Sequence, residues 1–224
     1  MLIIHENLPE EARALGIALR ELYEIPSHIE SCSLDGAFVP HSSGRGFFTS
    51  SPLLSETLGT VLQKPVLVIT PRDLYAGDKS PDDDWVFGYC ANNLMVASTA
   101  RMKRQDNKPS DVLAVPRKLY LERMTALALH EVGHGVVQAP HHKPAYWVNV
   151  RTGQSLALGP HCTEPNCLMY ESVDIRAPPR EEGHLLLGGE KRHDAGLDDF
   201  LERRLPDWLC HLCMPFVDVN ESYM

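Results

Sequence analysis

The stretch from His130 to His142, HEVGHGVVQAPHH, contains residue types whose spacing suits metal chemistry. His130 and His134 are four residues apart, so on a helix both imidazoles would point to the same side. Glu131 lies beside them, where its carboxylate could reach a water molecule on the metal. The pattern therefore predicts a zinc site on a helix, with the two histidines as ligands and Glu131 as a general base for hydrolysis.

A third protein ligand is needed, because a catalytic zinc uses three protein ligands and keeps its fourth position open for water. The candidates downstream are His141, His142 and His161. Pro140 should end the helix before the first two, since proline lacks an amide hydrogen and its ring would clash with the preceding turn. Spacing alone leaves all three histidines open.

Four of the six cysteines fall into two pairs further along the chain: Cys162 with Cys167, and Cys210 with Cys213. Four thiolates are the usual composition of a closed structural zinc site. A redox role for the Cys-x-x-Cys pair is a weaker interpretation, because this pair does not follow a strand in a βαβ pattern.

Taken together, these motifs resemble those of the archaemetzincins, a family of zinc metallopeptidases. Their signature joins His-Glu-x-x-His to a third histidine followed directly by cysteine, then a second cysteine, a methionine and a distant Cys-x-x-Cys. The second half of this signature is matched in order by His161, Cys162, Cys167, Met169, Cys210 and Cys213. The upstream segments RGFFTSSPLL, VLVITPRDLY, WVFGYC and VASTARM also resemble the family, so the likeness runs from about residue 45 onward.

The resemblance implies that His161 is the third ligand of the catalytic zinc and that Met169 lies beneath this zinc without binding it. It also implies a second, structural zinc on the four cysteines, which gives two zinc ions per chain. The chain departs from the family pattern in two ways: Val137 stands where the family has a glycine, and additional residues separate His134 from His161. His141 is close to the usual position of the third histidine, so it and His142 stay open as alternatives.

We expect a single domain over 1–224 with insertions at 139–160 and 176–192. The first insertion contains AYWVNVRTGQSLAL, two β-prone runs around a turn at Gly153, which predicts a hairpin. The second is rich in proline, glycine and charge, which favours an exposed loop. Because the cost of closing a loop grows slowly with its length, a hairpin whose ends meet would leave the zinc site intact.

The elements that must position these residues follow from hydrophobic periodicity. A helix is predicted over 9–23, with Ala12, Leu15, Leu19 and Leu22 on one face. Further predicted elements are a helix over 52–63 after Ser51, strands over 64–70 and 93–102, a long helix over 117–138, and a closing helix over 195–213 that carries Cys210 and Cys213. Together with the resemblance they predict an α/β, metzincin-like domain with a mixed sheet, a zinc-binding helix and a C-terminal half held by structural zinc.

The amino-acid composition indicates which classes of partner the protein is suited to bind. With 21 basic and 30 acidic residues in 224, the net charge is -9, which does not favour binding to nucleic acid or to an anionic membrane. No apolar run approaches the ~20 residues of a membrane span. The N-terminus lacks the basic start of a secretory signal, so we expect a cytoplasmic protein with reduced cysteines. The sequence gives no information on oligomeric state.

The predicted function is hydrolysis of peptide bonds in a peptide or protein substrate, through a zinc-activated water with Glu131 as base. The alternative is a noncatalytic zinc-binding scaffold whose site is obstructed by the 139–160 insertion. A weaker alternative is a hydrolase acting on a non-peptide amide.

Overall fold

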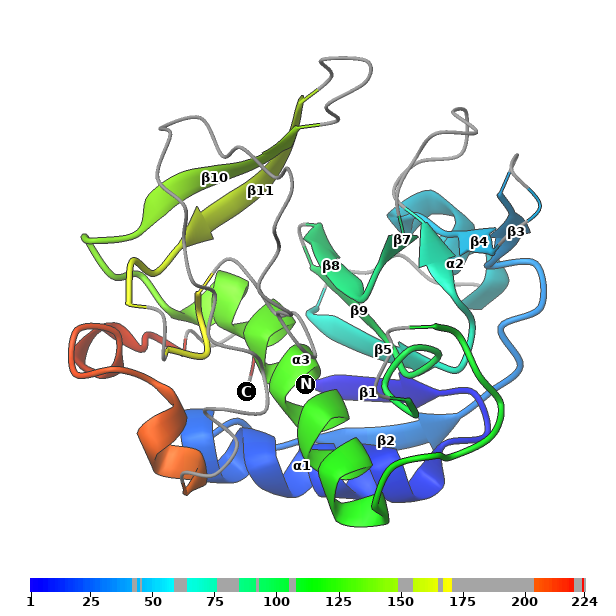
Figure 1. Ribbon diagram of the computed structural model, residues 1–224, viewed down its shortest axis with the longest axis horizontal. Coiled ribbons are helices and arrows are strands. Elements are labelled where there is room, and N and C mark those ends of the chain that lie inside the picture. Colours follow the sequence, from blue (N-terminus) through cyan, green and yellow to red (C-terminus); the bar gives the residue numbers. More distant parts are fainter. Residues whose placement is uncertain are drawn as a thin grey trace.

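The computed structural model of the chain describes residues 1–41, 44, 46–58, 64–75, 85–91, 93–104, 108–148, 155–164, 167–170, 204–219 and 223. The insertion predicted at 176–192 and the first part of the predicted closing helix, 195–203, lie outside these residues. The predicted α/β class with a mixed sheet is confirmed: a central sheet is flanked by helices on one face and by short strands and a helix on the other (Figure 1).

The central sheet has five strands in the order β2-β1-β5-β9-β8. Their bounds are β1 Leu2–His5, β2 His28–Ser31, β5 Val66–Thr70, β8 Gly88–Ala91 and β9 Leu94–Ser98. The first four strands in this order run parallel, and β8 pairs with β9 in the antiparallel direction. The predicted strands at 64–70 and 93–102 are thus confirmed as β5 and β9. The second ends earlier than predicted because the chain turns after Thr99, whose carbonyl accepts a hydrogen bond from the Met102 amide.

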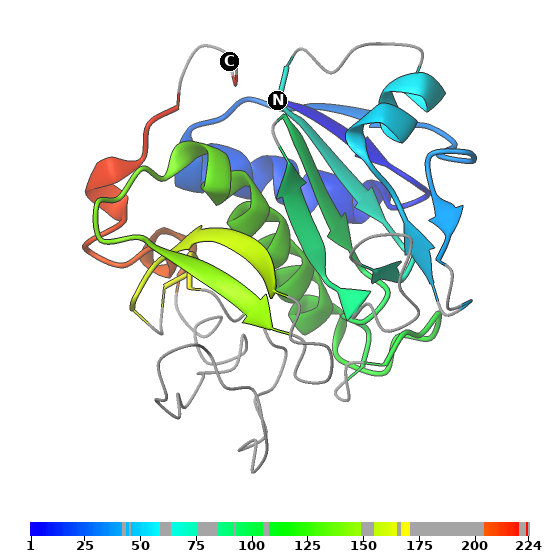
Figure 2. The same cartoon turned by 90° about the horizontal axis from the view of Figure 1, so that it is seen from above.

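The helices α1 (Pro9–Tyr23) and α3 (Arg117–Val136) cover one face of this sheet (Figure 2). The predicted apolar face of α1 is confirmed, since Ala12, Leu15, Leu19 and Leu22 are all buried. These residues share one core with α3 and with the sheet positions Ile3, Leu67, Ile69, Met95 and Ala97. This shared core holds α3, which carries the His-Glu-x-x-His pattern, against α1 and the strands.

The other face of the sheet is covered by shorter elements. These are β3 (Val39–Pro40), β4 (Phe47–Phe48), β6 (Leu74–Tyr75), β7 (Trp85–Val86) and the helix α2 (Ser51–Leu58). A second core forms here from the alternate sheet positions Ile4, Val66, Val68, Leu94 and Val96 together with Leu34, Phe38, Leu54 and Leu74. Burial on both faces explains why β5 and β9 read as continuous apolar runs.

The C-terminal part begins with the predicted hairpin, which is confirmed as β10 (Lys143–Val148) and β11 (Ser155–His161). The predicted turn residue Gly153 lies outside the described residues. The hairpin stands beyond the end of α3 (Figure 1), and its two ends meet because Lys143 pairs with His161.

The prediction of a closing helix that carries Cys210 and Cys213 is wrong for the described residues. Two short 3-10 helices, η1 (Leu205–Trp208) and η2 (Met214–Phe216), flank a turn that holds both cysteines. The Cys210 amide donates to the sulfur of Cys167 at 3.4 Å, and the Cys213 amide donates back to the Cys210 carbonyl. The Cys210 amide is thus bonded to a distant cysteine and the Cys213 amide to a carbonyl only three residues back, so both lie outside the α-helical hydrogen-bond pattern.

None of the helices in the described part of the chain combines the length and the apolar character that crossing a membrane requires.

Candidate active site and metal centres

Helix α3 positions the first two histidines of the site. It starts after Pro116 and ends at Val136, before Pro140 as predicted. Val137 then has φ -99° and ψ 105°, an extended conformation that any residue can adopt, and it pairs with Val217. The chain therefore leaves the helix without the positive φ that would favour the glycine expected at this position.

Three imidazoles converge at the end of this helix. His130, His134 and His161 each offer a ring nitrogen within 4.8 Å of the others. The ring centroids are 4.8 Å apart for His130 and His134, 5.2 Å for His130 and His161, and 4.7 Å for His134 and His161. Three imidazole nitrogens this close together are a donor set that suits a zinc ion.

Backbone carbonyls orient two of these rings. His130 Nδ1 donates to the Leu168 carbonyl at 2.6 Å, and His161 Nδ1 donates to the Gly159 carbonyl at 3.0 Å. A proton on Nδ1 leaves the lone pair of Nε2 free to bind a metal, and the second hydrogen bond fixes the ring. The geometry of both rings therefore fits a zinc ligand.

The hairpin brings His161 to this point. Its register places His161, the last residue of β11, opposite Lys143 at the start of β10. Gly159 has φ +84°, which favours glycine, and a Cβ there would lie 3.7 Å from the His134 ring. The 139–160 insertion is thus followed directly by His161, which lies next to the imidazoles of His130 and His134.

Burial sets the protonation of the three imidazoles. Loss of solvent, reinforced by the neighbouring histidines, lowers the pKa of His130 well below its usual range and that of His134 to about 3. Burial also lowers the pKa of His161 to about 4. The rings are therefore neutral at physiological pH, as metal ligands must be.

Glu131 follows His130 on α3 and is 6% exposed. Burial raises the pKa of its carboxyl to about 8. Its Oε1 faces Gly88 on β8, because a Cβ added to Gly88 would lie 3.0 Å from this oxygen and would also overlap the Val96 carbonyl. The absence of a side chain at Gly88 is what lets the strand and the carboxylate approach each other.

Met169 lies against the same helix and is fully buried. A Cβ added to Gly133 would overlap the Met169 sulfur and would lie 2.9 Å from the Tyr23 hydroxyl. Tyr23 in turn donates to the Leu129 carbonyl at 3.0 Å. Met169 therefore supports α3 by packing, in keeping with the packing role that the resemblance implied.

The four predicted cysteines form a second cluster. Cys162, Cys167, Cys210 and Cys213 have their sulfurs within 4.8 Å of one another. The sulfurs of Cys162 and Cys210 are 3.7 Å apart, and those of Cys167 and Cys213 are 3.5 Å apart. Two sulfurs on a tetrahedral zinc lie about 3.8 Å apart for bonds of about 2.3 Å, so the cluster fits a zinc ion.

The sulfurs of the cysteine cluster also influence one another's ionisation. Hydrogen bonds with Cys162 and Cys213 lower the pKa of Cys167 to about 2, whereas the hydrogen bonds of Cys213 with Cys162 and Cys167 raise the pKa of Cys213. Backbone amides of Glu164 and Cys210 donate to the Cys162 and Cys167 sulfurs. One thiolate is thus stabilised while further ionisation is opposed, and a bound cation removes that opposition.

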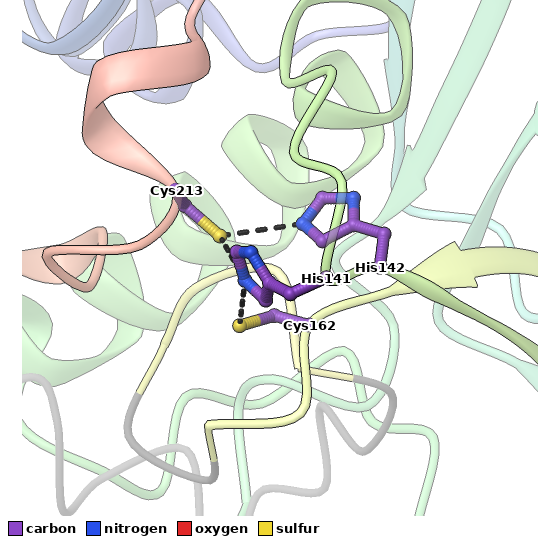
Figure 3. Close-up of side chains that lie close together, drawn as sticks. All are labelled: His141, His142, Cys162 and Cys213. Carbon is purple, nitrogen blue, oxygen red and sulfur yellow. Dashed lines mark hydrogen bonds between the residues drawn. The ribbon is translucent and has the colours of Figure 1, made fainter.

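The remaining candidates for the third zinc ligand lie elsewhere. His141 and His142 face the sulfurs of Cys162 and Cys213 (Figure 3), and the group of histidines around His130 contains His161 instead. Sequence reasoning did not identify the contact between Gly88 and Glu131, nor the hydrogen bond from His130 to the Leu168 carbonyl. Both contacts join segments far apart in the sequence, so no local pattern signals them.

No protein-family model matches the chain, and no curated protein matches it. The solved structures that are similar to it in fold include two with a TM-score of 0.50 or more. One is the crystal structure of archaemetzincin from Methanopyrus kandleri, with TM-score 0.52 and 20% identity over 96% of this chain and 91% of that chain. The other is a zinc-dependent peptidase from Methanocorpusculum labreanum, with TM-score 0.50 and 17% identity over 95% of this chain and 96% of that chain. The likeness shows that this chain has the archaemetzincin-like fold that its motifs imply.

Proposed function

We propose that the chain is a zinc metallopeptidase, in which His130, His134 and His161 hold the catalytic zinc and Glu131 is the general base. The observation that carries this proposal is the convergence of three ring nitrogens within 4.8 Å, with the buried Glu131 next in sequence to His130 on α3. The two solved structures of similar fold, named as an archaemetzincin and a zinc-dependent peptidase, support it.

The chemistry divides between the metal and the chain. Zinc bound by three histidines supplies a Lewis acid that lowers the pKa of water and polarises a substrate carbonyl. The chain supplies the proton acceptor. Glu131, whose carboxyl has a pKa of about 8 through burial alone, loses its proton more readily once a divalent cation is close. It then accepts a proton from the attacking water and donates it to the leaving amine.

Strand β8 offers a place for the substrate backbone. It is the last strand of the five-stranded sheet and runs antiparallel to β9. The backbone groups of an edge strand can pair with an extended peptide. Because Gly88 on this strand is in contact with Glu131, a peptide paired with β8 would pass next to the base.

The cysteine cluster serves stability in this proposal. Cys162 and Cys167 follow the hairpin, and Cys210 and Cys213 come from the C-terminal segment, so a zinc ion there joins two parts of the chain. Apparent binding energies of structural zinc sites, about 10 to 16 kcal/mol, are comparable to the stability of a whole domain. All six cysteines are free thiols, which suits the reducing cytosol where we place the protein.

The experiment that tests the proposal compares peptide cleavage by the zinc-loaded wild type and by Glu131→Ala. We expect Glu131→Ala to keep its zinc and its fold and to lose cleavage of an unfolded protein substrate by about 100-fold or more, because general base catalysis is removed. The control is Glu122→Ala. It removes a carboxylate of the same helix, one that pairs with Lys118 at the surface.

Equal cleavage by wild type and Glu131→Ala would contradict the role of Glu131. A zinc-loaded wild type that cleaves no peptide would favour the noncatalytic scaffold, or a hydrolase of non-peptide amides if a panel of such amides is cleaved instead.

A further inference from the structure

His141 and His142 lie against the cysteine cluster, although nothing in the motif of the cysteines requires them. They follow α3 in a turn in which the His142 amide donates to the Ala139 carbonyl at 3.0 Å. His141 Nε2 lies 3.1 Å from the sulfur of Cys162 and 3.5 Å from that of Cys213 (Figure 3). His142 Nε2 lies 3.3 Å from the sulfur of Cys213.

Two groups of four donors therefore share two sulfurs. One group consists of Cys162, Cys167, Cys210 and Cys213, and the other of His141, His142, Cys162 and Cys213. Each group contains four donor atoms within 4.8 Å, which is the number of ligands in a closed zinc site.

We propose that this cluster binds two zinc ions, with the thiolates of Cys162 and Cys213 bridging them. Cys167 and Cys210 complete the coordination of one ion, and His141 and His142 complete that of the other. Every one of the six donors is then used, and both ions are four-coordinate.

The spacing of the second group agrees with this arrangement. A nitrogen and a sulfur on one tetrahedral zinc lie about 3.5 Å apart, for bonds of about 2.1 and 2.3 Å. The three nitrogen–sulfur distances of 3.1, 3.3 and 3.5 Å are close to that value. The two imidazole rings are inclined at 75° with centroids 5.1 Å apart, so they do not stack and both can reach one point.

Charge favours a second ion. One zinc ion with four thiolates leaves a net charge of minus two, and three of the four cysteines here are buried. Burying uncompensated charge is costly. A second zinc ion bound by two neutral imidazoles brings the whole cluster to zero. The competing arrangement, in which both imidazoles only donate hydrogen bonds to the thiolates of a single zinc, fits the same distances but leaves part of this charge in place.

The number of zinc ions per chain separates the two arrangements. The full chain is loaded with zinc and freed of weakly bound metal, and its zinc content is measured against the protein concentration. We expect three ions in the wild type, two in the double variant His141→Asn/His142→Asn, and two in His161→Ala. The double variant should keep peptide cleavage, whereas His161→Ala should lose it, so the two lost ions belong to different sites.

Two zinc ions in the wild type, or an unchanged count in the double variant, would overturn the bridged cluster. X-ray absorption at the zinc edge of the wild type gives an answer that does not depend on how the variants fold. We expect scattering from a second zinc at the short distance that two shared sulfurs impose, and its absence would also overturn the proposal. Neither readout depends on peptidase activity. A result that overturns the two-zinc cluster would therefore not affect the proposed role of Glu131, which the cleavage experiment tests separately.

Discussion

Gly133 of α3 and Met169 beyond the hairpin are in direct contact, with no room between them for even one methyl group. Gly133 is one of the two unspecified positions in the His-Glu-x-x-His pattern, and Met169 is fully buried. The contact holds the helix that carries His130 and His134 against the segment whose Leu168 carbonyl orients His130.

Replacing Gly133 by alanine should therefore destabilise the protein. In an exposed helix this substitution would stabilise by roughly 1 kcal/mol. Here the new methyl group overlaps the Met169 sulfur and approaches the Tyr23 hydroxyl, so we expect a loss of roughly 1 to 3 kcal/mol, measured by urea unfolding of the zinc-loaded protein.

A double-mutant cycle with Met169→Ala provides the control for this prediction. If the contact causes the loss, Gly133→Ala should cost much less in the Met169→Ala background than in the wild type. Additive effects of the two substitutions would contradict the explanation.

A second prediction concerns β8, the strand that contacts the proposed base Glu131. Gly88→Ala places a methyl group against Glu131 Oε1 and the Val96 carbonyl, so the strand or the carboxylate must move. We expect zinc content to stay unchanged and peptide cleavage to fall by roughly 10-fold or more, because small displacements of a catalytic group are costly. The control is Ala91→Ser, an exposed position on the same strand, which should leave cleavage unchanged. Normal cleavage by Gly88→Ala would show that this contact does not position the base.

The fold and the site differ in how far local sequence predicts them. Helices α1 and α3 and strands β5 and β9 have periodic or continuous apolar patterns of ordinary length, and their positions follow from the sequence. Strand β1 was missed because LIIH is only four residues long, although it lies between β2 and β5 in the sheet. Strand β8, GYCA, was missed because it carries no alternation, and its place at the edge depends on pairing with β9.

Within the site, the helix pattern predicts that His130 and His134 share a face, because four residues make about one turn. The pattern does not say which later histidine joins them. That choice depends on the register of the hairpin, which pairs Lys143 with His161, and on the turn that directs His141 toward Cys162. Both are tertiary contacts, and the same holds for the turn that replaced the predicted helix at Cys210.

Zinc binding at the three-histidine site should also have a distinctive pH dependence. Burial lowers the pKa of His134 to about 3 and that of His161 to about 4. Imidazoles in water have a pKa of about 6.5 and compete with metal for protons below it. In the folded protein such competition should begin only as the pH approaches about 4.

We therefore expect the zinc affinity of this site to change little between pH 7 and pH 5 in a Glu131→Ala background, which removes the nearby carboxyl whose own pKa of about 8 would add a proton release on zinc binding. The affinity is measured by titration against a competing chelator, and the difference between Glu131→Ala and Glu131→Ala/His161→Ala isolates the site from the cysteine cluster. His28→Ala is the matched control, because His28 is an exposed histidine and should alter nothing. A steady loss of affinity that starts near pH 6.5 would contradict the prediction.

The most direct test of the proposed catalytic centre is a crystal structure of the zinc-loaded protein, with anomalous scattering recorded on both sides of the zinc absorption edge. The account predicts a zinc peak about 2.1 Å from one ring nitrogen each of His130, His134 and His161, with the Glu131 carboxylate facing its open side. A zinc-loaded crystal with no peak at these three histidines, or with a peak there completed by His141 or His142 in place of His161, would contradict it.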